Sequence, residues 1–123
     1  FFVFRRDGNA LAGGLTLSNV RRGVTQSCTV GYWMGESFAG AGLMTEAVRT
    51  IFPFVFERLG LHRLEAACVP NNEPSKAVLA RTGFQQEGLA RRYLRINGVW
   101  RDHLLYALLD SDLKARQPVL SRS

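Results

Sequence analysis

The amino-acid sequence predicts an α/β fold in a single domain, and three features of the sequence lead to that prediction. Residues 11–18, 28–34 and 63–69 alternate apolar and polar side chains, which is the two-residue period of half-buried strands. Apolar residues from Leu43 to Leu59 recur at helical spacing instead. Two further strand-like runs meet at Asn97-Gly98, a pair that favours a β-hairpin because both central residues of a type I′ turn need positive φ.

Length and composition fit one globular domain. The chain has 123 residues, of which 46% are hydrophobic and 21% charged, and this balance supplies one core. We expect one domain over residues 1–110 and a polar, loose tail over residues 111–123. The opening Phe1-Phe2-Val3-Phe4 is strand-like and lacks an initiating Met, so an N-terminal truncation is expected. No apolar run approaches the roughly 20 residues that cross a bilayer and the opening lacks signal-peptide features, which predicts a cytoplasmic location.

The first half of the chain is expected to run from strand to strand to helix. A turn at Arg21-Arg22-Gly23 separates the first two strands. The helix that begins near Leu43 should end at Gly60, a suitable C-cap. Pro53 deletes a backbone donor inside it, which predicts a kink or an early break.

The second half should continue with a strand, a short helix and the hairpin. Pro70 ends the strand over residues 63–69, and Asn71-Asn72-Glu73-Pro74 supplies N-cap candidates and an early-turn proline. A short helix from Ser75 to Thr82 follows, with Gly83 after it. The hairpin strands are expected over residues 84–96 and 99–109.

Charge and cysteine usage indicate the partners. The formal net charge is +6, and only Lys76 and Lys114 of the 16 basic residues are lysine. Arginine prefers bidentate contacts with phosphate and carboxylate, so an anionic partner such as a nucleotide cofactor or a ribosomal surface fits; a solvated arginine-rich surface fits equally. Cys28 and Cys68 lie in strand-like stretches without metal-ligand spacing, so they are interpreted as buried thiols and no metal site is predicted.

A glycine-rich loop joins the second strand to the long helix. Such a connection can hold a phosphate, because the free N–H groups of the loop and of the first helical turn converge on one anion. Without Cβ atoms at Gly40 and Gly42, backbone amides can approach a pyrophosphate closely. Glycine-rich connectors that only turn the chain are common, so the loop by itself leaves both readings open.

The order of these elements and their motifs together resemble the Gcn5-related N-acetyltransferases (GNAT family). Tyr32-Trp33-Met34 with the loop Phe38-Ala39-Gly40-Ala41-Gly42 is similar to the family's strand and pyrophosphate loop. Ser37 replaces the basic or amide residue of the usual pattern, which weakens a side-chain contribution there. Asn72-Glu73-Pro74-Ser75, followed by residues 79–84, is similar to the second half of the cofactor site.

Within the family, the chain most resembles the ribosomal-protein N-terminal alanine acetyltransferases, the RimJ and RimL group. That resemblance rests on Gly31-Tyr32, the Asn-x-x-Ser motif and the run from Asn97 to His103, and it covers roughly Leu11 to Asp110. It implies the GNAT acyl-CoA N-acyltransferase fold, a mixed and mostly antiparallel sheet with flanking helices, here with N-terminal elements missing. It implies acetyl transfer from acetyl-CoA to an amine by direct attack, with the N-terminal α-amine of a ribosomal protein as acceptor.

The resemblance also implies which residues contact the cofactor. Two strands, carrying Tyr32 to Met34 and Leu64 to Val69, should splay apart and hold the pantetheine arm between them. Ser75 could protonate or hydrogen-bond the leaving thiolate, and Asn72 could bind the pantetheine amides; alternatively, both only cap the helix. The implied cofactor contacts are Trp33, Met34, Phe38, Ala39, Gly40, Ala41, Gly42, Leu43, Asn72, Ser75 and Arg81.

The general base is the least determined role. An α-amine with a pKa of about 7.7 to 8.0 needs only modest help, whereas a lysine amine at about 10.4 needs much more. Glu65, on the splayed strand, is the first candidate for a catalytic base. It could equally be an exposed partner for an arginine. Asp102 and His103 are weaker candidates.

Other functions remain open at this stage. Small amines such as polyamines or aminoglycosides are alternative acceptors. A noncatalytic module that binds ribosomal RNA or a ribosomal protein would use the basic hairpin. A homodimer partner could complete a sheet edge left unpaired. The arginines of that hairpin are Arg91, Arg92, Arg95 and Arg101.

Overall fold

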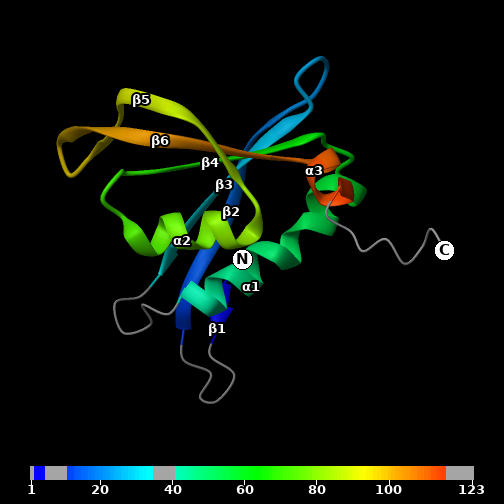
Figure 1. The fold of residues 1–123 in the computed structure, drawn as a ribbon, viewed down its shortest axis with the longest axis horizontal. Helices are drawn as coiled ribbons and strands as arrows, with labels where there is room; N and C mark the ends of the chain where they lie inside the picture. Colours follow the sequence, from blue (N-terminus) through cyan, green and yellow to red (C-terminus); the bar gives the residue numbers. More distant parts are fainter. Residues whose placement is uncertain (1, 5–10, 35–40, 116–123) are drawn as a thin grey trace.

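The computed structural model describes residues 2–4, 11–34 and 41–115. Its strands form one sheet, in the spatial order β1-β2-β3-β4-β6-β5 (Figure 1). The elements along the chain are β1 (Phe2–Phe4), β2 (Leu11–Arg21), β3 (Ser27–Met34), α1 (Ala41–Pro53), the π-helix η2 (Phe54–Arg58), β4 (Arg63–Cys68), α2 (Glu73–Thr82), β5 (Gln85–Ile96), β6 (Val99–Leu109) and α3 (Asp110–Ala115).

The sheet is mixed and mostly antiparallel, as predicted. β3 and β4 pair in parallel, and every other neighbouring pair of described strands is antiparallel. α1 and α2 lie side by side on one face of the sheet (Figure 1). The parallel pair follows from α1, because a strand–helix–strand connection returns the chain in the same direction.

The core lies between the sheet and the two helices. The inward positions of β3 and β4 alternate as expected, since Cys28, Val30, Leu64, Ala66 and Cys68 are all buried. Both cysteines are free and buried, which confirms their interpretation as buried thiols. Helix residues complete the same cluster, and each fully buried aliphatic side chain contributes roughly 1.5–3 kcal/mol. The helix residues in this cluster include Met44, Val48, Ile51, Phe52, Val55, Val78 and Leu79.

Pro53 ends α1, which confirms the early break. Proline has no N–H to donate and its ring crowds the carbonyl four residues earlier, so regular α-helical bonding stops there. The chain continues as the π-helix η2, with the Leu59 N–H bonded to the Phe54 carbonyl at 2.8 Å. The wider turn keeps Val55 and Phe56 buried in the core.

The boundaries of α2 agree with its capping residues. The Asn72 side chain accepts a hydrogen bond from the Ser75 N–H at 3.1 Å, which is the geometry of an N-cap. Pro74 occupies the first turn. Gly83 takes a left-handed conformation with φ of 96° and ends the helix.

The predicted hairpin is present, with a bulge that the sequence did not reveal. Asn97 and Gly98 both have positive φ, 50° and 78°, as a type I′ turn requires. The pairing shifts register between Ala90 and Leu94, and Arg92 has a φ of 45°. The Asp102 carboxylate accepts the Arg92 N–H at 2.8 Å and so stabilises the bulge.

Two boundary predictions were wrong. Arg21 belongs to β2 rather than to the turn, because it pairs with Ser27. Residues 111–115 are not a loose tail: α3 begins at Asp110, and the Asp112 carboxylate accepts the Leu109 N–H at 2.9 Å. Leu113 packs against the core, so one apolar side chain in a polar stretch holds this helix in place. Residues 116–123 lie outside the described residues.

The part of the chain that the structure describes has neither a membrane-spanning helix nor a cluster of metal ligands. No helix in this part is both long and apolar enough to cross a membrane. In the same part of the chain, no group of three or more His, Cys, Asp or Glu side chains is arranged to hold a metal ion.

Candidate active site

β3 and β4 separate where the resemblance implies that they should. Their parallel pairing joins Ser27 to Arg63, Cys28 to Leu64 and Thr29 to Glu65, and stops there in the described part of the chain. β3 continues to Met34 and β4 to Cys68. Among the described residues, no strand pairs with the backbone groups between these strand ends, so the gap can accept an extended ligand as an added strand.

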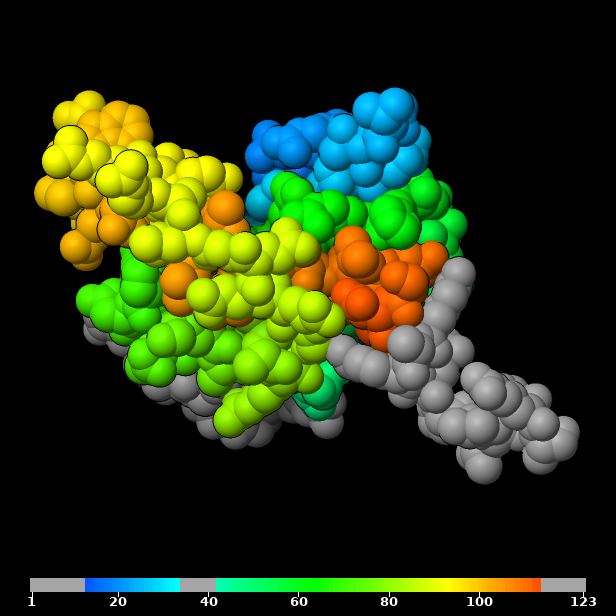
Figure 2. Space-filling view, turned by 45° about the horizontal axis from the view of Figure 1, so that its top comes forward, coloured from blue at the N-terminus to red at the C-terminus, as the bar shows by residue number. Residues whose placement is uncertain are grey.

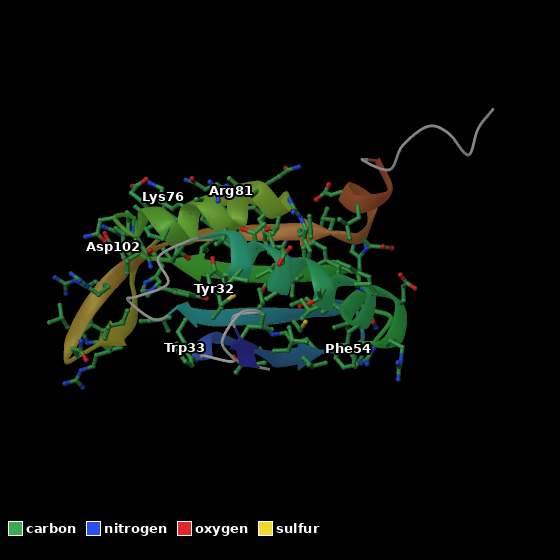
Figure 3. The ribbon with its side chains drawn as sticks, turned by 90° about the horizontal axis from the view of Figure 1, so that it is seen from below. Tyr32, Trp33, Phe54, Lys76, Arg81 and Asp102 are labelled. Carbon is green, nitrogen blue, oxygen red and sulfur yellow. The ribbon has the colours of Figure 1, made fainter. Side chains whose placement is uncertain are left out.

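Met34 and Trp33 lie at the open end of β3. Met34 pairs with Gly13 of β2 on one side and faces the gap on the other. The Trp33 side chain is half exposed. Figure 3 draws Trp33 at the opposite edge of the molecule from α2. The backbone at this end of β3 is therefore available to a ligand, while the indole faces away from α2.

The glycine-rich loop is described only where it enters α1. Phe38, Ala39 and Gly40 lie outside the described residues. Ala41 begins the helix, Gly42 is exposed, and Leu43 packs against the core. A Cβ atom added at Gly42 would meet nothing within 4 Å, so the space beside this first helical turn is open. The N–H groups of a first turn lack intrahelical partners and attract anions, so this end of α1 fits a phosphate group.

The start of α2 reaches the same gap from the helix side. Ser75 is only 6% exposed, and its Oγ lies 2.8 Å from the Tyr32 hydroxyl. The Tyr32 hydroxyl also donates to the Ser75 carbonyl at 3.0 Å. Burial raises the pKa of the Cys68 thiol, and the Ser75 side chain, which lies beside this residue of β4, lowers it. One buried serine therefore joins β3, β4 and α2 beside the separated strands.

Asn72 and Arg81 have the structural contacts expected of helix residues. Asn72 Oδ1 is used as the N-cap, and the Asn72 side chain is otherwise exposed. Arg81 lies in the last turn of α2 with an exposed side chain, and its carbonyl accepts a bond from the Arg49 guanidinium at 2.8 Å. Figure 3 shows Arg81 and Lys76 along α2.

Glu65 lies on the opposite face of the sheet from Ser75. Its carboxylate accepts a hydrogen bond from Arg63 Nε at 2.7 Å and lies 3.7 Å from Arg21 Nη1. Arg63 also pairs with Glu87. Glu65 therefore pairs with arginines, as the alternative to a catalytic base expected. Glu65 is not adjacent to Ser75, since the sheet separates them.

A cleft runs over this second face of the sheet. It lies between β2 and the β5–β6 hairpin, and Figure 2 shows the hollow between the blue and the yellow segments. Its volume is about 470 Å³. Gly31, Glu65 and Ala67 line it from the separated strands, and Tyr93 and Leu94 line it from the hairpin. The separated part of β3 and β4 therefore borders this cleft on one face of the sheet, and buried Ser75 lies on the other face.

The weaker base candidates have other contacts. Asp102 accepts the Arg92 N–H, which is the bulge contact. His103 is buried, with Nδ1 3.0 Å from the Arg101 carbonyl and its ring against Tyr93. Neither residue is among those that line the cleft.

Sequence reasoning did not identify the partners of Ser75. Tyr32 was assigned to the strand of the family motif and Cys68 was interpreted as a buried thiol, but neither was linked to Ser75. An inward tyrosine carries a hydroxyl that needs a hydrogen-bond partner, and that signal was available in the alternation of β3. The partner itself is 43 residues away in the chain, so the sequence could not name it.

Comparisons with known proteins complete the description of this site. The family model "Acetyltransferase (GNAT) domain" matches residues 1–85. The chain belongs to the GNAT acetyltransferase family. A GNAT relative from Bacillus subtilis (strain 168), the probable N-acetyltransferase YjcK, is 41% identical over 112 residues, covering 91% of this chain and 62% of the relative. The ribosomal protein uS5-alanine N-acetyltransferase of Escherichia coli (strain K12) is 40% identical over 112 residues, covering 91% of this chain and 58% of the relative.

A solved GNAT structure has the same fold. RimJ of Mycobacterium smegmatis in complex with CoA-disulfide superposes with a TM-score of 0.81 and 42% identity, covering 93% of this chain and 54% of that chain. The chain therefore spans somewhat more than half the length of these relatives.

Proposed function

We propose that this chain carries the acetyl-CoA site of an N-acetyltransferase whose acceptor is the N-terminal α-amine of a ribosomal protein. The observation that supports the proposal most directly is the separation of β3 and β4 after Thr29 and Glu65. It occurs in a chain that is 40% identical to a relative named for alanine N-acetylation of ribosomal protein uS5. A cytoplasmic location, where ribosomal proteins are made, belongs to the same proposal.

The residues along the gap fit an extended cofactor. Backbone groups at Met34 would bind the pantetheine amides, with Asn72 and Trp33 at either side. The first turn of α1, at Ala41, Gly42 and Leu43, would bind the pyrophosphate together with Phe38, Ala39 and Gly40, and Arg81 would add a positive charge. When bound, acetyl-CoA supplies an activated thioester.

Ser75 and Glu65 would then act from opposite faces of the sheet. Ser75 would hydrogen-bond the leaving sulfur from the helix side. The acceptor amine would enter through the cleft, where the Glu65 carboxylate would accept its proton directly or through water. Direct attack needs both substrates in one site, and the cleft reaches the separated strands at Gly31 and Ala67.

The cofactor half of the proposal is tested by calorimetry with acetyl-CoA. The wild-type chain should bind, and Gly42→Asp should lose at least tenfold in affinity, because it places a carboxylate beside the first helical turn. Gly88→Asp adds the same charge on β5, where an added Cβ also meets nothing within 4 Å, and should bind as wild type does. A folded wild-type chain that does not bind acetyl-CoA would contradict the proposal.

The acceptor half is tested by competition between amines. A peptide that begins with alanine should accept the acetyl group, whereas the same peptide with a blocked N-terminus should not. Spermidine is the comparison for the small-amine alternative. Transfer to spermidine in preference to the peptide would contradict the ribosomal-protein acceptor and favour a small-amine acceptor.

A second candidate function is contact with an anionic ribosomal surface. It is favoured by the hairpin arm, defined here as residues 89–102, which carries four arginines and one acidic residue, Asp102. Large apolar side chains on the arm are also exposed. A second copy of the chain could cover them instead of a ribosomal surface. They are Leu89, Tyr93, Leu94, Ile96, Val99 and Trp100.

A further inference from the structure

The Tyr32 hydroxyl lies where it can control the Ser75 side chain. Tyr32 is in the part of β3 that has left β4, and its Oη lies 2.8 Å from Ser75 Oγ and 3.0 Å from the Ser75 carbonyl oxygen. Ser75 is buried, so both contacts are largely shielded from water. Hydrogen bonds in such surroundings are stronger than exposed ones and are costly to leave unmade.

The protons of this cluster can be assigned from the chemistry of its members. A carbonyl oxygen only accepts, so the Tyr32 hydroxyl donates to the Ser75 carbonyl. The phenolic oxygen then accepts the Ser75 hydroxyl proton across the 2.8 Å contact. In this arrangement Ser75 has no proton for a second acceptor.

A single rotation reverses the arrangement. If the Tyr32 O–H turns from the carbonyl to Ser75 Oγ, the same 2.8 Å contact is kept and the Ser75 proton becomes free to donate elsewhere. No heavy atom has to move. The Ser75 carbonyl retains its intrahelical bond, since Ser75 lies in the first turn of α2.

We propose that Tyr32 is a positioning residue that acts through Ser75, so that Ser75 hydrogen-bonds the leaving sulfur only while Tyr32 donates to Ser75 Oγ. The inference rests on the proposed function. In the transfer the C–N bond forms, the electron pair of the broken C–S bond stays on sulfur, and the base takes the amine proton. Ser75 and Tyr32 keep their own protons.

Tyr32 is suited to donate without ionising. Burial raises the pKa of Tyr32 to about 12, outweighing the hydrogen bond to Ser75, which lowers it. The hydroxyl therefore stays protonated across the pH range in which an α-amine acceptor titrates, about 7.7 to 8.0.

The test uses coenzyme A itself and needs no acceptor or turnover. The thiol pKa of bound coenzyme A is measured by ultraviolet absorbance of the thiolate during a pH titration of the complex with this chain. Tyr32→Phe should raise that pKa by about one unit, a tenfold change, because the thiolate loses support from Ser75. Ser75→Ala should raise it as much, and the double variant should show no further rise.

Two further variants separate this role from a structural one. Thr82→Val removes another buried hydroxyl of α2, which donates to the Val78 carbonyl at 2.8 Å, and should leave the bound thiol pKa unchanged. Fluorotyrosine at position 32 keeps the ring and is a stronger donor, so it should lower the pKa. Equal thiol pKa values in wild type and Tyr32→Phe, or additive effects of Tyr32→Phe and Ser75→Ala, would overturn this inference but not the proposed function. A wild-type chain that does not bind coenzyme A would overturn the proposed function and the inference with it.

Discussion

At the scale of single residues, Arg63 organises the acidic side chains of the cleft. Its guanidinium binds Glu87 and, through Nε, Glu65. These two carboxylates, Glu87 first, raise the pKa of Arg63, and Arg63 in turn lowers the pKa of Glu87. Both glutamates thus share one cation, but only Glu65 lies on β4, the strand that separates from β3. The same substitution at Glu65 and at Glu87 therefore tests whether Glu65 takes part in the reaction or only pairs with Arg63.

Replacing each glutamate with glutamine should separate the two roles. Glu65→Gln should lower kcat for transfer at least tenfold, because glutamine cannot accept the amine proton. Glu87→Gln removes a partner of the same arginine and should leave kcat within about twofold. Steady-state kinetics with an alanine-first peptide measures both. Equal kcat values for the two variants would remove Glu65 from the reaction.

The Arg63–Glu87 pair should also give stability a pH dependence. The folded-state pKa of Glu87 lies below its ordinary value of 4.5, so the pair stabilises the fold above that pH and the contribution is lost as the pH falls below it. The side chains are partly exposed, so Glu87→Gln should cost less than about 1 kcal/mol at pH 7. Urea unfolding at pH 7 and at pH 3 checks this. A difference from wild type that persists at pH 3 would contradict it.

At the scale of elements, the junction from α1 to β4 depends on two backbone-specific residues. Pro53 stops regular α-helical bonding, and the π-helix η2 then carries Val55 and Phe56 into the core. Gly60 closes the junction with a φ of 65°, a conformation that costs an L side chain roughly 1–2 kcal/mol. β4 can therefore start at Arg63, in parallel register with Ser27 of β3.

Gly60→Ala should lower the free energy of unfolding by about 1 kcal/mol. An added Cβ at Gly60 meets nothing within 4 Å, so any loss comes from backbone strain rather than from a clash. Gly88→Ala is the matched control, with open space at its Cβ and no positive φ. Chemical denaturation of both variants measures the difference. A Gly60→Ala protein as stable as the Gly88→Ala control would show that the junction tolerates a side chain.

At the scale of the whole molecule, the cofactor gap and the arginines of the hairpin arm lie in different regions, although Tyr93 and Leu94 of the arm line the cleft. The helices cover one face of the sheet, the cleft opens on the other, and the hairpin arm extends beyond both (Figure 1, Figure 2). Four of the 16 basic residues are on the arm. Contacts of the arm with a large anionic partner can therefore be weakened without changing the cofactor gap.

Arg95→Gln with Arg101→Gln should weaken binding to ribosomal particles and reduce its salt dependence. Each lost phosphate contact lowers the slope of log affinity against log salt by about one. Acetyl-CoA affinity should remain that of wild type. Sedimentation with purified ribosomes at several salt concentrations measures ribosome binding, and calorimetry measures acetyl-CoA affinity. An unchanged salt slope would exclude the arm as a ribosome contact, and light scattering would then test whether a second copy covers it.

The sequence by itself determined most local structure in this protein, because local structure depends on neighbouring residues. The alternation in residues 28–34 and 63–69 predicted β3 and β4, Asn72 and Gly83 predicted the limits of α2, and Asn97-Gly98 predicted the hairpin turn. Pro53 predicted a kink or an early break in a helix expected to reach Gly60, and α1 ends at Pro53. The motifs around Gly40 and Asn72 to Ser75 identified the family. Leu113 was not recognised as a residue that packs against the core, because nothing nearby in the sequence marks this apolar side chain as partly buried.

Only the tertiary structure decided which distant side chains meet. Tyr32, Cys68 and Ser75 come from three elements, and their contacts depend on how α2 packs on the sheet. Likewise, Glu65 faces Arg63 and Arg21 because of strand register. Strand and helix periodicity state which face a side chain occupies but not what covers that face. The partners of Ser75 and Glu65 therefore follow from packing and register, which only the folded chain specifies.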